Sequence, residues 1–191
     1  MTDNELHVVF GTGPVGLAVM DELVSKGKRV RMVNRSGRAN VAEGVEVVGG
    51  DAADPTFTRK VSEGASVVYF ALNPPYDKWP ELVPPLQAGV LEGASSVGAK
   101  LIAVENLYMY GPNGGRPITE DLPHAPNTRK GTVRATMAKE LMEAHTSGKV
   151  RVTVGRASDF FGSRVLTSAA GEQVFGRAVA GKSAQVAGDP D

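Results

Sequence analysis

The sequence predicts an α/β protein built on a doubly wound parallel sheet flanked by helices. Short apolar runs alternate with segments of helical spacing through most of the 191 residues. The run at 66–72 is almost continuously apolar, as expected of a strand that is buried on both faces. A glycine-rich turn at 11–16 joins the first apolar run directly to a helical pattern. Right-handed strand–helix–strand units of this kind produce a parallel sheet.

The expected elements alternate along the chain. Strands are expected at 6–10, 29–33, 45–48, 66–72, 100–105 and 150–154, and helices at 15–23, 55–63, 86–97 and 132–145. The pairs Pro74-Pro75 and Pro84-Pro85 predict that no regular helix forms between 73 and 85. Trp79 in that segment either flanks a ligand crevice or packs in the core. The loop expected from Asn106 to about Lys130 has a length that is usually functional.

Composition excludes several classes of function. The formal net charge is zero, so nothing favours nucleic acid or an anionic membrane as a partner. There is no cysteine, which removes disulfides, thiol nucleophiles and cysteine metal sites, and the three histidines lack metal-ligand spacing. No metal site is therefore expected. No apolar stretch approaches the ~20 residues that span a bilayer, and the first apolar run is too short for a signal peptide. A cytoplasmic protein of ordinary globular composition is expected.

The turn after the first strand has the spacing of a dinucleotide-binding loop, G-x-G-x-x-G. Gly11 allows the sharp turn, Gly13 leaves room for a pyrophosphate, and Gly16 allows the helix to pack closely on the sheet. Pro14 and Val15 complete the loop. The free N–H groups at the start of the helix favour the negative charge of phosphates.

Several motifs in order resemble the extended or atypical short-chain dehydrogenases/reductases, the NAD-dependent epimerase/dehydratase group. The motifs are GTGPVG at 11–16, GDA at 50–52, AL at 71–72, YMYGP at 108–112, RASDFFG at 156–162 and GDPD at 188–191. The ordered set is more specific than any one motif, and it covers the whole chain. The resemblance implies a Rossmann fold, a nicotinamide dinucleotide cofactor and a small-molecule substrate that the sequence does not identify.

The resemblance also assigns cofactor contacts. It implies that Asp51 and Ala52 contact the adenine ring. Ala71, Leu72 and the adjoining Asn73 would pass under the ribose and phosphate, and the turn containing Ala157 would lie beside the nicotinamide.

The residues after the second strand predict a preference for NADP(H) over NAD(H). Sites specific for NAD hold the ribose hydroxyls with a carboxylate at this place. Here the chain has Asn34, Arg35, Ser36 and, two residues later, Arg38. A guanidinium pairs well with a 2′-phosphate.

The usual catalytic pair of the family is missing. The tyrosine and lysine of Tyr-x-x-x-Lys would fall at Gly131 and Ala135, and no Tyr-x-x-x-Lys occurs anywhere in the chain. The upstream serine is replaced by Asn106, which can still donate a hydrogen bond to a carbonyl. The candidate surrogates are therefore Asn106, Tyr108, Tyr110 and Lys130, with Arg134 near the same helix start.

Two functions remain open at this point. The chain is an NAD(P)-binding protein without the usual chemistry, such as a cofactor sensor, or an oxidoreductase or epimerase that uses surrogate acid/base residues. Residues 1–160 are expected to form the cofactor domain, and 161–191 to begin a C-terminal substrate lobe that is otherwise largely absent. The sheet edge and crevice would then be partly uncovered, and homodimer formation is left open.

Overall fold

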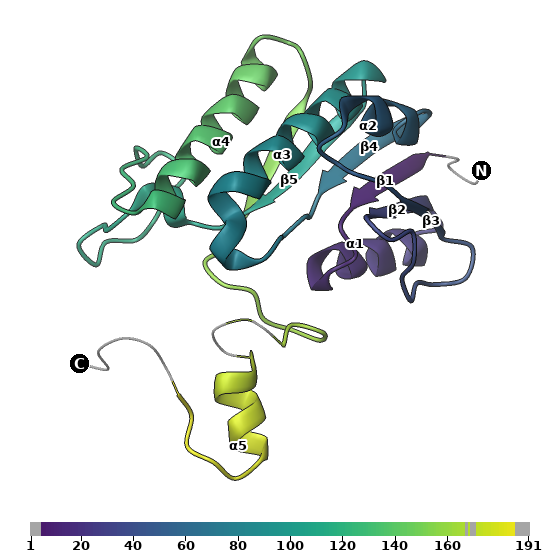
Figure 1. The fold of residues 1–191 in the computed structure, drawn as a ribbon. Helices are drawn as coiled ribbons and strands as arrows, with labels where there is room; N and C mark the ends of the chain where they lie inside the picture. Colours follow the sequence, from purple (N-terminus) through teal and green to yellow (C-terminus); the bar gives the residue numbers. More distant parts are fainter. Residues whose placement is uncertain (1–4, 167, 169–170, 186–191) are drawn as a thin grey trace. The chain divides into compact units, whose positions relative to one another are not determined.

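Six parallel strands form one sheet in the order β3-β2-β1-β4-β5-β6 (Figure 1). The strands are β1 Leu6–Phe10, β2 Arg29–Asn34, β3 Glu46–Gly49, β4 Ala65–Phe70, β5 Lys100–Glu105 and β6 Val152–Arg156. This computed structural model describes residues 5–166, 168 and 171–185. The strand order confirms the predicted Rossmann sheet. It reverses between β1 and β4, which is where such sheets bind ligands.

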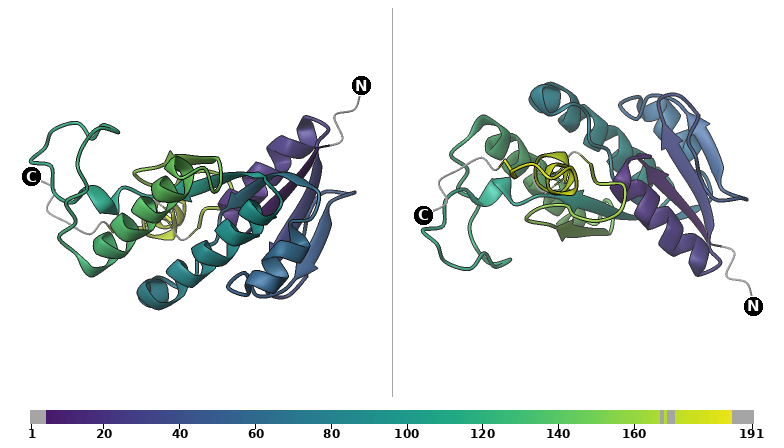
Figure 2. Two further views of the ribbon diagram at one scale, coloured as in Figure 1. Left: turned by 90° about the horizontal axis from the view of Figure 1, so that it is seen from above. Right: turned by 90° about the horizontal axis from the view of Figure 1, so that it is seen from below.

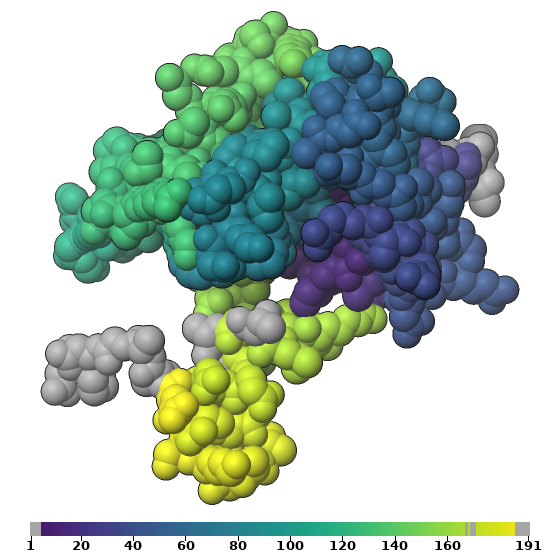
Figure 3. Space-filling view, viewed as in Figure 1, coloured from purple at the N-terminus to yellow at the C-terminus, as the bar shows by residue number. Residues whose placement is uncertain are grey.

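Helices cover the two faces of the sheet unequally. The helices are α1 Pro14–Ser25, α2 Pro55–Val61, α3 Trp79–Ser96 and α4 Arg129–Thr146. Residues of α2, α3 and α4 pack in one core cluster with Val8 and Phe10 of β1, whereas α1 packs on the opposite face with Val9 (Figure 2). The alternation within β1 thus sends successive side chains into two cores. Figure 3 shows the face that α3 and α4 cover.

The expected interruption of α3 by prolines is wrong. The helix begins at Trp79 and continues through Pro84 and Pro85. Proline in a helix interior removes a hydrogen bond and crowds the preceding turn. Burial of Trp79 and Val83 in the core compensates this loss, and the Trp79 indole N–H donates to the Pro74 carbonyl at 3.0 Å. Trp79 is therefore a core residue, one of the two roles considered for it.

The chain divides into two compact units, Met1–Arg156 and Ala157–Asp191. In the second unit a π-helical turn, η3 Gly171–Gly176, leads into the short α5 Arg177–Val179. The rings of Phe161 and Phe175 lie 5.2 Å apart within this unit. The GDPD motif at 188–191 lies outside the described residues.

Candidate functional site

At two positions the glycine-rich loop after β1 has no room for a side chain. Gly11 has φ of 118°, and a Cβ there would lie 2.4 Å from the Ala71 carbonyl oxygen. A Cβ on Gly16 would lie 1.9 Å from the Gly11 carbonyl oxygen. The turn and the close approach of α1 to the sheet therefore both depend on the missing side chains.

Gly13 differs, because nothing lies within 4 Å of the place its Cβ would take. It is the N-cap of α1, and no side chain caps that end of the helix; Pro14 follows within the first turn. The loop therefore presents open space beside uncapped backbone N–H groups, which is what a pyrophosphate requires. The residues present fit the phosphates of a dinucleotide.

Asn34 at the end of β2 organises the turn that follows it. Its amide group donates to Thr12 Oγ1 at 3.0 Å and to the Arg38 carbonyl at 2.9 Å. Its Oδ1 accepts from the N–H of Ser36 at 3.0 Å and of Gly37 at 2.7 Å. One side chain thus links the glycine-rich loop to the basic turn.

Arg35 and Arg38 project from this turn into solvent, since both are exposed. Neither guanidinium forms a hydrogen bond or an ion pair with another residue in the part of the chain that the structure describes. Two cations without a protein partner stand beside the crevice end of β2, and they are free to pair with an anionic group.

The other predicted cofactor residues follow β3 and β4. Asp51 is exposed, and its Oδ1 accepts from the Ala53 N–H at 2.9 Å. Ala52 is buried, and its carbonyl oxygen would lie 2.1 Å from a Cβ on Gly89 of α3. The Ala71 N–H donates to the Phe10 carbonyl at 2.9 Å, which holds the β4 end beside the glycine-rich loop. Leu72 and Asn73 follow directly. Ala157 begins the second unit, and its role stays a prediction.

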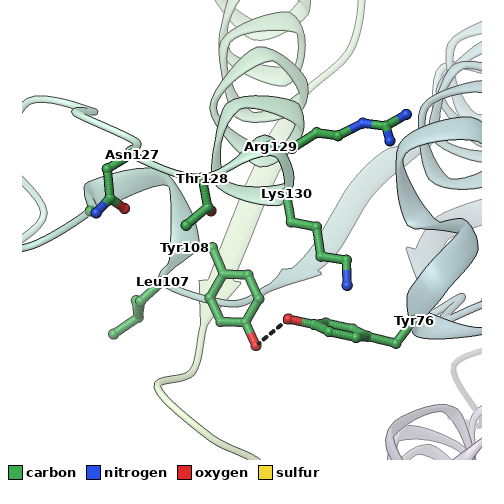
Figure 4. A pocket seen from close by; sticks show the side chains of 8 residues that line it. Tyr76, Leu107, Tyr108, Asn127, Thr128, Arg129 and Lys130 are labelled. Atoms are coloured by element: carbon green, nitrogen blue, oxygen red, sulfur yellow. Dashed lines mark hydrogen bonds between the residues drawn. The ribbon is translucent and has the colours of Figure 1, made fainter.

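A pocket of about 550 Å³ lies at the start of α4. Its lining comes from three segments: Tyr76 before α3, Leu107, Tyr108 and Gly111 around the turn η2 Tyr108–Tyr110, and residues 127–130. The hydroxyls of Tyr76 and Tyr108 are 3.5 Å apart, and the Lys130 ammonium lies over the Tyr76 ring, 3.1 Å from its centroid (Figure 4). Tyr76 was missed because its proline-rich surroundings give no motif.

The four candidate surrogates do not share one place. Tyr108 and Lys130 both line the pocket. Asn106 is buried, and its Oδ1 accepts from the Tyr108 N–H at 3.1 Å, so it supports the turn. The Tyr110 hydroxyl is buried and accepts from Arg156 Nη1 at 2.5 Å.

The helix phase explains which residues of α4 reach this region. Gly131 faces the backbone of η2, because a Cβ there would lie 2.7 Å from the Tyr108 carbonyl oxygen. Ala135 packs on the cluster of Met109 and Tyr110. Lys130 and Arg134, four residues apart, instead lie over the rings of Tyr76 and Trp79. The pair that shares the aromatic side of the helix is Lys130 and Arg134.

A cluster of buried charges joins the ends of β5 and β6 to α4. Arg156 Nε pairs with Glu105 Oε2 at 3.2 Å, and Glu105 is only 2% exposed. Burial raises the pKa of Glu105, although its hydrogen bond with Arg156 and the charges of Arg156 and Arg134 oppose this shift. Burial lowers the pKa of Arg134, with Glu105 opposing. This cluster fixes the crevice ends of both strands.

Among the described residues, no cluster of three or more His, Asp or Glu side chains could hold a metal ion. No helix in the described part of the chain is long and apolar enough to cross a membrane.

The strand order, the steric demands of Gly11 and Gly16 and the open helix start define a dinucleotide-binding Rossmann protein. The sequence model described as NAD(P)H-binding matches residues 11–153. The chain therefore belongs to this NAD(P)H-binding family, and it binds a nicotinamide dinucleotide. No curated protein matches the sequence significantly.

Solved structures of epimerases and related enzymes share the fold. The Bordetella bronchiseptica enzyme WbmG, in complex with NAD and UDP, is 20% identical with a TM-score of 0.78, over 95% of this chain and 61% of its own. A UDP-galactose 4-epimerase is 23% identical with a TM-score of 0.78, over 91% and 63%. The Thermotoga maritima UDP-glucose 4-epimerase with UDP-glucose is 19% identical with a TM-score of 0.74, over 83% and 57%. The chain spans about 60% of their length. At these identities the comparison shows that the fold is shared.

Proposed function

We propose that this chain is an NADP(H)-preferring member of the epimerase/dehydratase group that lacks the usual Tyr-x-x-x-Lys chemistry. The observation that carries the preference is the pair of exposed, unpaired guanidiniums on the turn after β2, where NAD-specific sites have a carboxylate. A 2′-phosphate would pair with Arg35 and Arg38. In this proposal residues 1–160 are the cofactor domain, and 161–191 begin a substrate lobe.

Each part of the crevice has a separate task in this proposal. The loop of Gly11, Gly13 and Gly16 holds the pyrophosphate through backbone N–H groups, and Asp51 and Ala52 border the adenine. The bound cofactor would supply hydride transfer. The chain's own groups at the other end, Tyr108 and Lys130, would contact the substrate.

The test is titration of the purified protein with NADPH and NADH. We expect NADPH to bind at least about tenfold more tightly, and Arg35→Ala to weaken NADPH binding by about tenfold while leaving NADH unchanged. Arg151→Ala removes an exposed arginine at the opposite end of the sheet and serves as the matched control. Equal affinities, or an unchanged NADPH affinity in Arg35→Ala, would contradict the preference.

A second candidate function is an active oxidoreductase or epimerase that transfers protons through surrogates. It is favoured by the presence of Tyr108 and Lys130 in one pocket with Tyr76. NADPH-dependent turnover would be screened on carbonyl and nucleotide-sugar substrates. Turnover that is abolished by Tyr108→Phe or Lys130→Ala would establish catalysis by a surrogate. Tyr110→Phe tests the buried hydroxyl, which we expect to act only through structure.

The first candidate predicts tight NADPH binding without turnover. Gly131→Tyr is a poor way to restore the family chemistry, because position 131 lies against the Tyr108 backbone. Lys130→Tyr with Arg134→Lys places the missing pair on the aromatic side of α4 instead.

A further inference from the structure

The start of α4 carries positive charge that the protein balances only in part. The first turn contains Arg129 and Lys130 and no acidic residue. Arg129 pairs with Glu81 of α3 at 2.9 Å. Lys130 has no carboxylate partner among the described residues and lies instead on the Tyr76 ring. One cation in the pocket lining is therefore left without a counter-ion.

The contact of Lys130 with Tyr76 leaves its hydrogen-bonding capacity unused. A cation over an aromatic face is held by the ring quadrupole, so its N–H donors facing away from the ring stay available. The ring also fixes the long side chain, and less conformational entropy is lost when the ammonium contacts a ligand. The Lys130 ammonium is therefore held in place with N–H donors that can bind an anion.

Arg134 adds a second cation one turn further along the same helix. It is 4% exposed, its guanidinium carbon lies 4.3 Å from the centroid of the Trp79 ring, and its Nε and Nη1 have no hydrogen-bond partner in the described structure. An incompletely paired buried guanidinium raises the local positive potential. Both cations therefore favour negative charge beside the pocket.

The side of the pocket on which Lys130 rests is aromatic. Tyr76 is 53% exposed and Tyr108 is 40% exposed, and both rings contact Trp79, with centroids 4.9 Å and 6.0 Å away. Exposed rings held by a buried tryptophan form a rigid platform for a flat ligand. The volume of about 550 Å³ is typical of small-molecule sites.

We propose that this pocket binds a small organic oxyanion, a phosphate or carboxylate carried on a flat ring, with Lys130 contacting the anionic group. Tyr76 and Tyr108 contact the ring. The inference names the substrate class of the proposed cofactor-dependent site and in that sense rests on the proposed function. Binding at the pocket itself requires no cofactor.

Trp79 makes the test direct, because it is the single tryptophan of the chain and contacts both tyrosines. Its fluorescence is followed during titration with phenyl phosphate, benzoate, inorganic phosphate and benzyl alcohol, and calorimetry measures the same affinities independently. We expect saturable binding of phenyl phosphate or benzoate at least about tenfold tighter than benzyl alcohol or inorganic phosphate. The first two probes distinguish phosphate from carboxylate ligands.

Variants then assign the anion contact to one side chain. Lys130→Met should weaken binding of the ring oxyanion by about tenfold, and Lys130→Arg should retain most of it. The matched control is Lys139→Met on the exposed side of α4, where Lys139 pairs with Glu143, and it should bind as the wild type does. Thermal unfolding of each variant verifies that the fold is intact.

Equal binding of benzyl alcohol, no weakening in Lys130→Met, or no saturable binding by calorimetry would each overturn the proposal. Repeating the titration at saturating NADPH locates the site, since loss of phenyl phosphate binding would mean that the probe occupies the cofactor phosphate site instead. NADPH titration of the same variants separates the two proposals. Absent NADPH binding with retained phenyl phosphate binding refutes the proposed function and leaves the pocket assignment standing.

Discussion

Two regions of the crevice are built in different ways. At the end of β1 the site consists of backbone, and its geometry is imposed by the absence of side chains at Gly11 and Gly16. At the start of α4 the site consists of long side chains, with Lys130 and Arg134 over aromatic rings. In the first region few amino-acid substitutions can be tolerated. In the second region, substitution of a side chain can change the chemistry while the helix stays the same.

In the proposed function, this difference gives the first region a general task and the second a particular one. Backbone N–H groups hold a phosphate whatever the rest of the chain does, so the loop specifies a cofactor class. Side chains on a rigid helix determine which small molecule fits and which protons move. The predictions below perturb each region, beginning with the largest effect.

The largest effect is expected from Gly16→Ala. Its Cβ would overlap the Gly11 carbonyl oxygen at 1.9 Å, and because this oxygen belongs to the backbone, no flexible side chain can move aside. We expect a loss of about 4 kcal/mol in the free energy of unfolding together with loss of NADPH binding. Gly13→Ala is the matched control, because open space surrounds its Cβ. It should keep its stability in denaturant titration and lose cofactor affinity alone. Equal destabilisation of both variants would contradict this account.

Breaking the buried ion pair between Glu105 and Arg156, near the start of α4, should lower the free energy of unfolding by about 3 kcal/mol. Arg156→Met leaves the Glu105 carboxyl buried without its partner and removes the donor to Tyr110. The double variant Arg156→Met/Glu105→Leu removes both charges, and we expect it to recover most of the loss. Urea unfolding of the single and double variants measures the coupling. A double variant that is no more stable than Arg156→Met would show that the ion pair is not the source of the loss.

The sequence predicted the backbone-determined region better than the side-chain-determined one. Spacing alone predicted the sharp turn at Gly11 and the close packing at Gly16, since both follow from steric rules that hold locally. The positions of the Tyr76 and Tyr108 rings depend on the start of α3 at Trp79. Prolines usually indicate a loop in sequence, but α3 continues through Pro84 and Pro85 because its residues pack in the core.

The sequence also did not reveal which face of α4 points toward the aromatic rings. An offset of one residue turns a helix by about 100°, so the expected positions Gly131 and Ala135 face the η2 turn, while Lys130 and Arg134 face the rings. The choice between these adjacent pairs depends on contacts across about fifty residues of chain, as between Arg134 and Trp79, and no local pattern records them.

A smaller effect on stability is expected from a change of pH, through the buried cluster of Glu105, Arg156 and Arg134. Because burial raises the pKa of Glu105 above its usual 4.5, folding favours the protonated carboxyl. Its contribution to stability is therefore complete below about pH 4.5 and is lost as the pH rises through the raised pKa of the folded state. Glu105→Gln should lack this contribution to the slope, so the variant should gain stability relative to the wild type between pH 4 and pH 7. Parallel melting curves over that range test the sign, and a relative loss would refute it.

The smallest change in stability is expected from Asn34→Asp. Asn34 links the glycine-rich backbone loop, through Thr12, to the turn that carries the charged side chain of Arg38. The carboxylate can still accept from the N–H groups of Ser36 and Gly37, but it cannot donate to Thr12 or Arg38. We expect a loss of about 1 kcal/mol in unfolding free energy from these hydrogen bonds. The new charge should also repel a 2′-phosphate and favour ribose hydroxyls, so NADPH affinity should fall about tenfold while NADH affinity is kept or increases. Asn40→Asp adds the same charge on a nearby exposed side chain and should change the ratio of the two affinities much less. If both variants shifted that ratio equally, general electrostatics rather than the Asn34 position would determine the cofactor preference.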